Sequence, residues 1–243
     1  MHLLTVEGVS KHFGGLKALD RISFHIEAGE IMAVIGPNGA GKTTLFNVLT
    51  GFLQPDQGRI FLEGQGLLGK KPHQICRLGM VRTFQIVKPF LEMTVLDNVI
   101  VGAYNRSRSL NEAREKALEI IDFVGLGEKK RAMAFELTLP HRKRLELARA
   151  LATDPKLLLL DEVMAGINPT ETDTLIALIR AIHGKGVTIL LIEHVMRGVM
   201  ALAQRIAVLN FGQMIAMGPP QEVVSDPQVI EAYLGEERDV AQG

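Results

Sequence analysis

One eight-residue run restricts the fold of this chain more than any other feature. Residues 36–43 read Gly-Pro-Asn-Gly-Ala-Gly-Lys-Thr and match the pattern G-x-x-x-x-G-K-[ST]. The apolar stretch Ile31–Ile35 comes directly before the run, and Lys42–Leu49 has the apolar spacing of a helix. A strand, a glycine-rich turn and a helix in this order predict a phosphate-binding loop inside an α/β fold.

The residue types of this loop suit a chain of phosphates. Glycines let successive backbone N–H groups turn inward around phosphate oxygens, and the start of a helix adds partial positive charge. Lys42 adds a full positive charge, and the hydroxyl of Thr43 is a ligand for Mg²⁺. A chance glycine turn is the alternative. The predicted nucleotide-binding residues here are Gly36, Pro37, Asn38, Gly39, Ala40, Gly41, Lys42, Thr43 and Thr44.

Two adjacent acids follow a second apolar run. Asp161 and Glu162 come directly after Leu157–Leu160. Open α/β sheets bind ligands at the carboxyl ends of their strands, so we expect Asp161 to hold Mg²⁺, directly or through water. Glu162 would orient and deprotonate an attacking water. An ordinary acidic helix cap has the same sequence pattern, so the prediction depends on the nearby phosphate loop.

The apolar runs also predict how the sheet is built. Thr188–Ile192 and Ile206–Leu209 are continuously apolar rather than alternating. Strands of this kind are covered on both faces, which predicts a parallel sheet between helices such as Thr172–His183. The expected fold class is therefore α/β, with a parallel-sheet core of the P-loop NTPase (RecA-like) type.

Two further regions depart from the parallel pattern. Near the N-terminus, Leu3–Val6, Arg21–Ile26 and Gly58–Glu63 predict a separate antiparallel β subdomain. In the middle of the chain, Asn111–Val124 places apolar residues on one helical face, and Arg142–Leu151 is a second helical pattern. We interpret this stretch as an α-helical subdomain inserted into the core.

Length and composition limit the remaining possibilities. The 243 residues suit a single domain, with a core at 1–87 and 153–243 and the helical subdomain at 88–152. Equal numbers of Lys plus Arg and Asp plus Glu, 27 each, argue against a nucleic-acid partner. A lone Cys76 fits a reducing compartment. We expect neither a secretory leader nor a membrane span.

Longer stretches resemble the ATPase subunits of ATP-binding-cassette (ABC) transporters, from near residue 4 to near residue 235. Within that superfamily the chain is most similar to the ATPase of high-affinity branched-chain amino-acid importers. The resembling stretches are FGGLKAL (13–19), IGPNGAGKTTLFNVLTGF (35–52), VRTFQ (81–85), EMTVLDNV (92–99), RLELARAL (144–151), AGINP (165–169), LIEHVMRGVM (191–200) and VIEAYLGE (229–236). Three of these strings are more specific than the motifs shared by the whole superfamily: RTFQ, IEH followed by Met, and AYLGE.

The resemblance implies roles for single residues. Phe13 matches the aromatic residue that stacks on adenine, and Gln85 matches the glutamine that meets Mg²⁺ and the attacking water. His194 matches the histidine that contacts the γ-phosphate. The alternatives are a core phenylalanine for Phe13, a surface glutamine for Gln85 and a structural histidine for His194. Gly166 and Asn168 match the loop at the seam between two such subunits.

One segment departs from the superfamily pattern. The signature LSGGQ, which covers ATP bound by a second subunit, aligns with Leu-Thr-Leu-Pro-His at 137–141. Thr138 keeps a hydroxyl for that nucleotide, whereas Pro140 has no N–H to donate. A lost hydrogen bond to a charged group costs about 1.5–3 kcal/mol. We therefore predict a weakened composite site.

Together these matches imply a peripheral ATPase on the cytoplasmic face of the inner membrane that uses ATP and Mg²⁺. Its implied partners are permease subunits, a second ATPase subunit and, indirectly, a periplasmic substrate-binding protein, with no nucleic acid. Candidate permease contacts are Arg82, Phe84, Phe90 and Met93; a local core is the alternative. Other functions that remain open are urea, amide or other amino-acid import, lipopolysaccharide export, a soluble non-transport ABC ATPase, and a regulatory module that hydrolyses ATP poorly.

Overall fold

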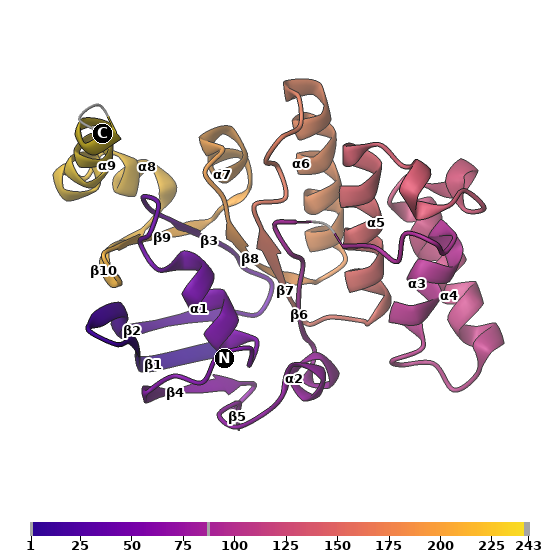
Figure 1. Cartoon of the computed structure of the whole chain (residues 1–243), viewed down its shortest axis with the longest axis horizontal. Coiled ribbons are helices and arrows are strands. Elements are labelled where there is room, and N and C mark those ends of the chain that lie inside the picture. Colours follow the sequence, from indigo (N-terminus) through magenta and orange to yellow (C-terminus); the bar gives the residue numbers. More distant parts are fainter. Residues whose placement is uncertain (1, 87, 241–243) are drawn as a thin grey trace.

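A six-stranded sheet forms the centre of the protein (Figure 1). The computed structural model describes residues 2–86 and 88–240. The strand order is β10 (Gln213–Gly218), β9 (Arg205–Asn210), β3 (Ile31–Ile35), β8 (Thr188–Ile192), β7 (Leu157–Asp161) and β6 (Met80–Arg82). All neighbouring strands are parallel except β10, which is antiparallel to β9. Every residue of β3, β7 and β8 is buried, as their continuous apolar runs predict.

The predicted antiparallel subdomain is present as a second sheet. Its order is β2 (Leu16–Glu27), β1 (His2–Phe13), β4 (Gln57–Leu62) and β5 (Gln65–Gly66). Strands β1 and β2 are each 12 residues long, well beyond the predicted ranges. Their outer halves contain polar residues and shifts of register, which hide the strand pattern in the sequence. The β1–β2 hairpin ends at the pair Phe13 and Leu16.

The central sheet separates two hydrophobic cores. Met32 and Val34 of β3 face α1 (Lys42–Leu49) and the antiparallel sheet. Ile31, Ala33 and Ile35 face the opposite core, which contains side chains from α6 (Pro169–Gly184) and α7 (Met196–Leu202). This alternation is the two-residue period of a strand covered on both faces. Three more helices complete the α/β part: α2 (Pro72–Leu78), α8 (Pro220–Val224) and α9 (Pro227–Val240).

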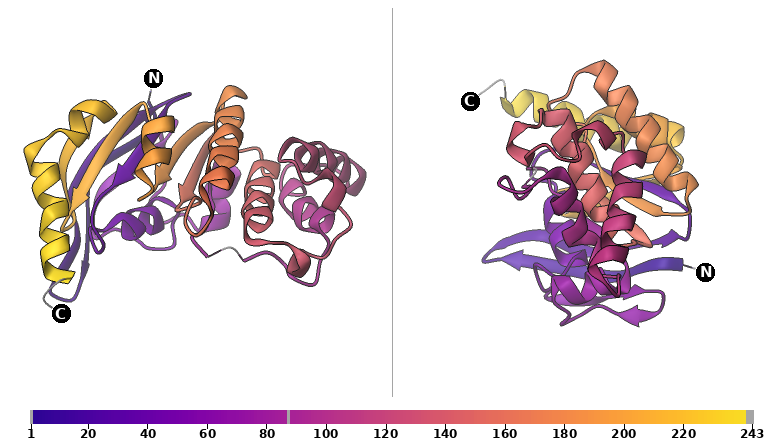
Figure 2. Two further views of the ribbon diagram at one scale, coloured as in Figure 1. Left: turned by 90° about the horizontal axis from the view of Figure 1, so that it is seen from above. Right: turned by 90° about the vertical axis from the view of Figure 1, so that its right-hand side faces the viewer.

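The helical segment lies at the end of the molecule opposite α8 and α9 (Figure 2). It contains α3 (Val95–Ala103), α4 (Leu110–Phe123), α5 (Leu139–Ala152) and two short 3₁₀ turns, Gly127–Lys129 and Ala134–Glu136. These helices share a hydrophobic cluster of their own. The boundaries of this segment at residues 88 and 152 remain a prediction. Within residues 2–86 and 88–240, no helix is both long and apolar enough to span a membrane.

Helix α5 begins three residues before the predicted start at Arg142. Thr138 is its N-cap residue, and Pro140 lies in the first turn, where a missing N–H costs little. Helix α3, which the apolar spacing alone did not identify, starts at an N-cap made by Thr94, whose hydroxyl accepts a hydrogen bond from the backbone N–H of Asp97.

Gly36 shows how closely the phosphate loop packs on the neighbouring strand. Its φ is +150°, and a Cβ added there would lie 2.1 Å from the carbonyl oxygen of Leu209 in β9. Replacing Gly36 with Ala should therefore lower the free energy of unfolding, measured by urea denaturation, by about 1–3 kcal/mol.

Gly184 is the control for this substitution, because nothing lies within 4 Å of an added Cβ at the end of α6. Gly184→Ala should leave stability unchanged or raise it by about 0.5–1 kcal/mol. Equal effects of the two substitutions would contradict the close contact at Gly36.

Candidate nucleotide site

The phosphate loop joins the end of β3 to the start of α1. Gly41 is the N-cap residue of α1 with a φ of +105°, and a Cβ there would meet the carbonyl oxygen of Ala18 at 2.4 Å. The Lys42 ammonium donates hydrogen bonds to the carbonyl oxygens of Gly36 (2.6 Å) and Pro37 (2.8 Å). These bonds fold the lysine back over its own loop, so its charge lies where the loop's N–H groups would meet an anion.

A cavity of about 410 Å³ lies over this loop. Its lining includes nine predicted site residues: Phe13, Asn38, Gly39, Ala40, Gly41, Lys42, Thr43, Thr44 and Glu162. Gln85, a tenth, also lines it. Gly36 and Pro37 contribute the carbonyl oxygens that hold Lys42. The site therefore brings together residues from the hairpin, the phosphate loop and the ends of two further strands.

Two exposed aromatic side chains line the same cavity. Phe13 is 47 % exposed at the tip of the β1–β2 hairpin, so the alternative of a core phenylalanine is wrong. Phe211, on the turn between β9 and β10, is 83 % exposed and was missed in the sequence. The next residue, Gly212, donates its N–H to the carbonyl oxygen of Ala40 at 3.0 Å, which holds this turn against the phosphate loop. The sequence signal that could have identified Phe211 is its place in an Asn-Phe-Gly turn directly after a parallel strand.

The three predicted catalytic side chains meet at one carboxylate oxygen. Glu162 Oε2 accepts a hydrogen bond from Gln85 Nε2 at 2.5 Å and lies 3.6 Å from His194 Nδ1. Each residue follows a different parallel strand: Gln85 follows β6, Glu162 follows β7 and His194 follows β8. The backbone of Glu162 has a φ of +47°, a conformation that costs a non-glycine residue about 1–3 kcal/mol and is concentrated at functional sites.

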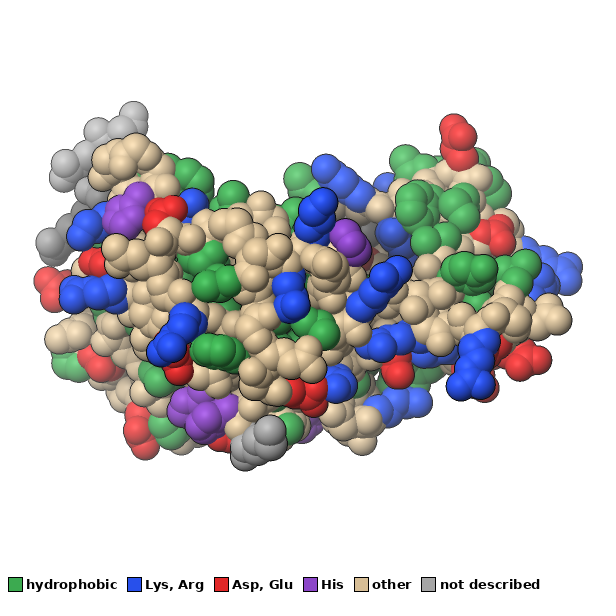
Figure 3. Space-filling view, turned by 90° about the horizontal axis from the view of Figure 1, so that it is seen from below, with side chains coloured by type: hydrophobic (Ala, Val, Ile, Leu, Met, Phe, Trp, Pro, Cys, Tyr) green, Lys and Arg blue, Asp and Glu red, His purple; other side chains and the backbone are tan. Residues whose placement is uncertain are grey.

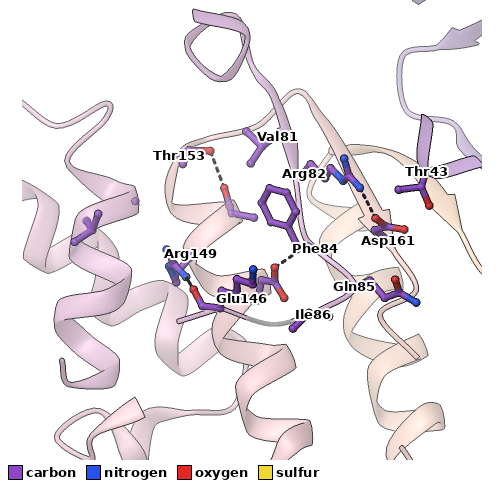
Figure 4. Close-up of a pocket in the computed structure, with 14 residues that line it drawn as sticks. Thr43, Val81, Arg82, Phe84, Gln85, Ile86, Glu146, Arg149, Thr153 and Asp161 are labelled. Atoms are coloured by element: carbon purple, nitrogen blue, oxygen red, sulfur yellow. Dashed lines mark hydrogen bonds and ion pairs between the residues drawn. The ribbon is translucent and has the colours of Figure 1, made fainter. Parts of the chain in front are cut away.

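Asp161 has a different environment from its neighbour Glu162. Its buried Oδ2 accepts a hydrogen bond from Arg82 Nη2 at 2.5 Å, and Arg82 Nη1 also bonds Asn47 Oδ1 at 2.6 Å. Both side chains of the ion pair are 5 % exposed, so the expectation that Arg82 contacts a partner is wrong. Asp161 and Thr43 nevertheless line one cavity of about 520 Å³ (Figure 4). A hydroxyl and a carboxylate on one cavity wall form a donor set suited to Mg²⁺.

Two buried charged side chains near the acid pair, Lys143 and Glu193, were not predicted from the sequence. Glu193 is 1 % exposed, and its Oε1 accepts the N–H of Met164 at 2.8 Å. Burial raises the pKa of Glu193 to about 7. Lys143 of α5 is also buried and donates to the carbonyl oxygen of Glu162 at 3.3 Å, while burial lowers the pKa of its ammonium.

Thr138 lies apart from both cavities described above. It caps the N-terminal end of α5, and its hydroxyl is 2.8 Å from His141 Nδ1. Desolvation, together with the charges of Lys129 and Arg144, lowers the pKa of His141. Its predicted role, contact with a nucleotide held by a second subunit, stays a prediction.

A glycine-rich loop between a buried parallel strand and a helix, with an acid pair on the next strand but one, defines a phosphate-loop nucleotide-binding protein. Residues 19–165 match the family described as ABC transporter. Residues 213–239 match the C-terminal family described as branched-chain amino acid ATP-binding cassette transporter. The chain belongs to the ABC transporter family, in its ATP-binding-cassette branch, which confirms the predicted family and fold.

Named relatives agree over nearly the whole chain. The high-affinity branched-chain amino acid transport ATP-binding protein BraF of Pseudomonas aeruginosa is 42 % identical, over 96 % of this chain and 98 % of that protein. The protein LivG of Escherichia coli, which has the same description, is 43 % identical over the same shares. A crystal structure of the ADP conformation of an ABC transporter's ATP-binding cassette has a TM-score of 0.88 and 38 % identity, covering 97 % of this chain and all of that one (100 %).

The contacts of Glu162 lead to a prediction about turnover. Glu162→Gln should reduce the rate of ATP hydrolysis by about 10²–10⁴-fold, because an amide cannot accept the proton of an attacking water. ATP binding should persist, since the phosphate loop is unchanged. Phosphate release and the binding of a fluorescent ATP analogue measure the two properties.

Glu63→Gln is the matched control. Glu63 is a second glutamate with a positive φ (+48°), but it is exposed, pairs with Lys156 and lines neither cavity of the site. Its substitution should leave hydrolysis unchanged. Near-normal turnover of Glu162→Gln would remove Glu162 from the role of base.

Proposed function

We propose that this chain binds and hydrolyses ATP as the energising subunit of an importer of branched-chain amino acids. The observation that carries the proposal is the meeting of Gln85, Glu162 and His194 at one carboxylate oxygen. Gln85 and Glu162 also line the cavity over the phosphate loop. The likeness of residues 213–239 to branched-chain amino acid cassettes supports the cargo class.

Residues of this site can be assigned to each part of ATP hydrolysis. The loop's N–H groups and Lys42 would hold the phosphates, with Phe13 against the adenine. Glu162 would take a proton from a water whose oxygen bonds to the γ-phosphorus as the bond to ADP breaks, with Gln85 orienting the water and His194 contacting the γ-phosphate. Thr43, Gln85 and Asp161 would hold Mg²⁺, which neutralises phosphate charge when bound.

A second ATPase subunit fits the exposed start of α5. The N-terminal end of this helix, with Thr138 as N-cap, does not line the cavity over the chain's own phosphate loop, but its dipole attracts anions. Two chains placed head to tail would each cover the other's ATP with this end. Hydrolysis would then remove the charge-assisted contacts that hold the pair together.

The surface around Gln85 supports a membrane-embedded partner. Phe84, Ile86 and Val101 line the 520 Å³ cavity and are between 43 % and 69 % exposed. Phe90, whose ring lies against Arg149 of that lining, is 45 % exposed. Apolar side chains also gather at the end of the molecule that contains α3–α5 (Figure 3). Exposed apolar patches of this kind mark protein interfaces. We assign this surface to a permease helix, whose docking would place the chain at the cytoplasmic face of the membrane.

Reconstitution tests this function directly. The chain would be purified together with its permease subunits and placed in proteoliposomes with their substrate-binding protein. Labelled leucine should enter only with ATP, and Lys42→Ala should stop both uptake and ATP binding. A chain that never copurifies with an integral-membrane partner would contradict the importer assignment, and retained ATP affinity in Lys42→Ala would contradict the phosphate role.

The signature position leads to a separate prediction. Because Pro140 has no N–H, Pro140→Gly should restore one hydrogen-bond donor at the start of α5 and raise the ATPase rate of the assembled importer or its affinity for ATP. The lost bond is worth about 1.5–3 kcal/mol, so the gain should reach about tenfold or more. No rise in either quantity would show that Pro140 weakens nothing.

A further inference from the structure

Helix α5 turns a row of charged side chains toward the core instead of the solvent. Lys143, Glu146 and Arg149 are spaced three residues apart, so they share one face of the helix. Lys143 is 5 % exposed and Glu146 is 9 % exposed. Buried charges are expensive unless they are hydrogen-bonded, so their partners indicate what this face is for.

All three side chains form hydrogen bonds with the backbone of the two loops that contain Gln85 and Glu162. Lys143 donates to the carbonyl oxygen of Glu162 at 3.3 Å. Glu146 Oε1 accepts the N–H of Phe84 at 2.6 Å, and Arg149 donates to the carbonyl oxygen of Lys88 at 3.0 Å. Figure 4 shows Glu146 beneath Phe84, with Arg149 beside it on the same helix. The loop that contains Gln85 is therefore tied to α5 on both sides of Gln85.

The bond from Glu146 is the one nearest to Gln85 in the chain. Thr83 is held from the opposite side, where its N–H donates to Leu159 of β7 at 2.9 Å. Phe84, the next residue, is held by Glu146, and the side chain of Gln85 then reaches Glu162 at 2.5 Å. Moving the Phe84 backbone away from α5 would move Gln85 away from Glu162.

We propose that Glu146 is a positioning residue that places Gln85 against Glu162 by accepting the N–H of Phe84. The inference rests on the proposed ATPase function and adds a residue to it. It also gives α5 a second task, because a shift of the helix at Thr138 is passed through Glu146 to the water-orienting glutamine.

The role requires an acceptor oxygen more than a charge. Burial raises the pKa of Glu146 to about 7, so the carboxyl group is not strongly held in its ionised form. An amide carbonyl has nearly the same size and position and also accepts an N–H. Glu146→Gln should therefore keep the positioning, whereas Glu146→Leu keeps the volume and loses the acceptor.

Steady-state ATP hydrolysis by the full chain provides the first test. Glu146→Leu should lower kcat by about tenfold or more with KM for ATP within about twofold, because a displaced catalytic group slows the chemical step without weakening nucleotide binding. Glu146→Gln should stay within about threefold of the natural protein, a rescue that simple loss of packing does not predict. Glu115→Leu, on the exposed face of α4, is the control and should change nothing.

Hydrogen exchange of the Phe84 amide provides the second test and needs no hydrolysis. Protection should fall in Glu146→Leu and persist in Glu146→Gln, so the anchor is judged even if the natural protein proves inactive, which would contradict the proposed function alone. If Glu146→Leu does not fold, Glu146→Asp, whose oxygens are one methylene short, should show both losses. Full turnover and protection in the Leu or Asp variant, or equal losses in the Gln variant, would overturn the inference.

Discussion

The close packing of a side-chain-free loop against two neighbouring backbones is the constraint on which the site depends. A Cβ on Gly36 would overlap the end of β9, and one on Gly41 would overlap the β1–β2 hairpin. The loop can therefore lie where the parallel sheet and the antiparallel sheet meet. This contact brings Phe13, on the hairpin, to the same cavity as Lys42, although they belong to different sheets. Without it, the residues proposed to bind the base and the phosphates would not face a common cavity.

Strand order accounts for the second half of the site. Strands β6, β7 and β8 are adjacent and parallel, so the residues that follow them emerge at one edge of the sheet. Gln85, Glu162 and His194 are 109 positions apart at the extremes of the sequence, yet they meet at one oxygen. The positive φ of Glu162 turns its side chain out of the strand direction, toward the other two. The parallel topology thus supplies the geometry that no local motif encodes.

The packing of the phosphate loop and the order of the strands also explain which features could be predicted from the sequence. The ranges of β3 and α1 were predicted from the apolar patterns on either side of the glycine-rich run, and the two acids from their place after an apolar strand. The ion pair of Arg82 with Asp161 could not be predicted, because it forms only where β6, a strand of three residues, lies beside β7. Phe211 was missed because its turn reaches the loop only through the pairing of β9 with β3. Residues that reach the site only through the pairing of strands distant in sequence have no distinctive pattern in the sequence around them.

Helix α5 connects the features that a list of motifs would treat separately. Its first turn holds Thr138 and Pro140, the positions expected to meet a second subunit's nucleotide. Two turns further on, Glu146 holds the backbone beside Gln85, and Lys143 holds that of Glu162. A helix is stiff along its axis, so displacement of one end displaces the other. If closure of two subunits presses on the start of α5, the same movement adjusts the groups around the attacking water, and a weakened contact at Pro140 would loosen both.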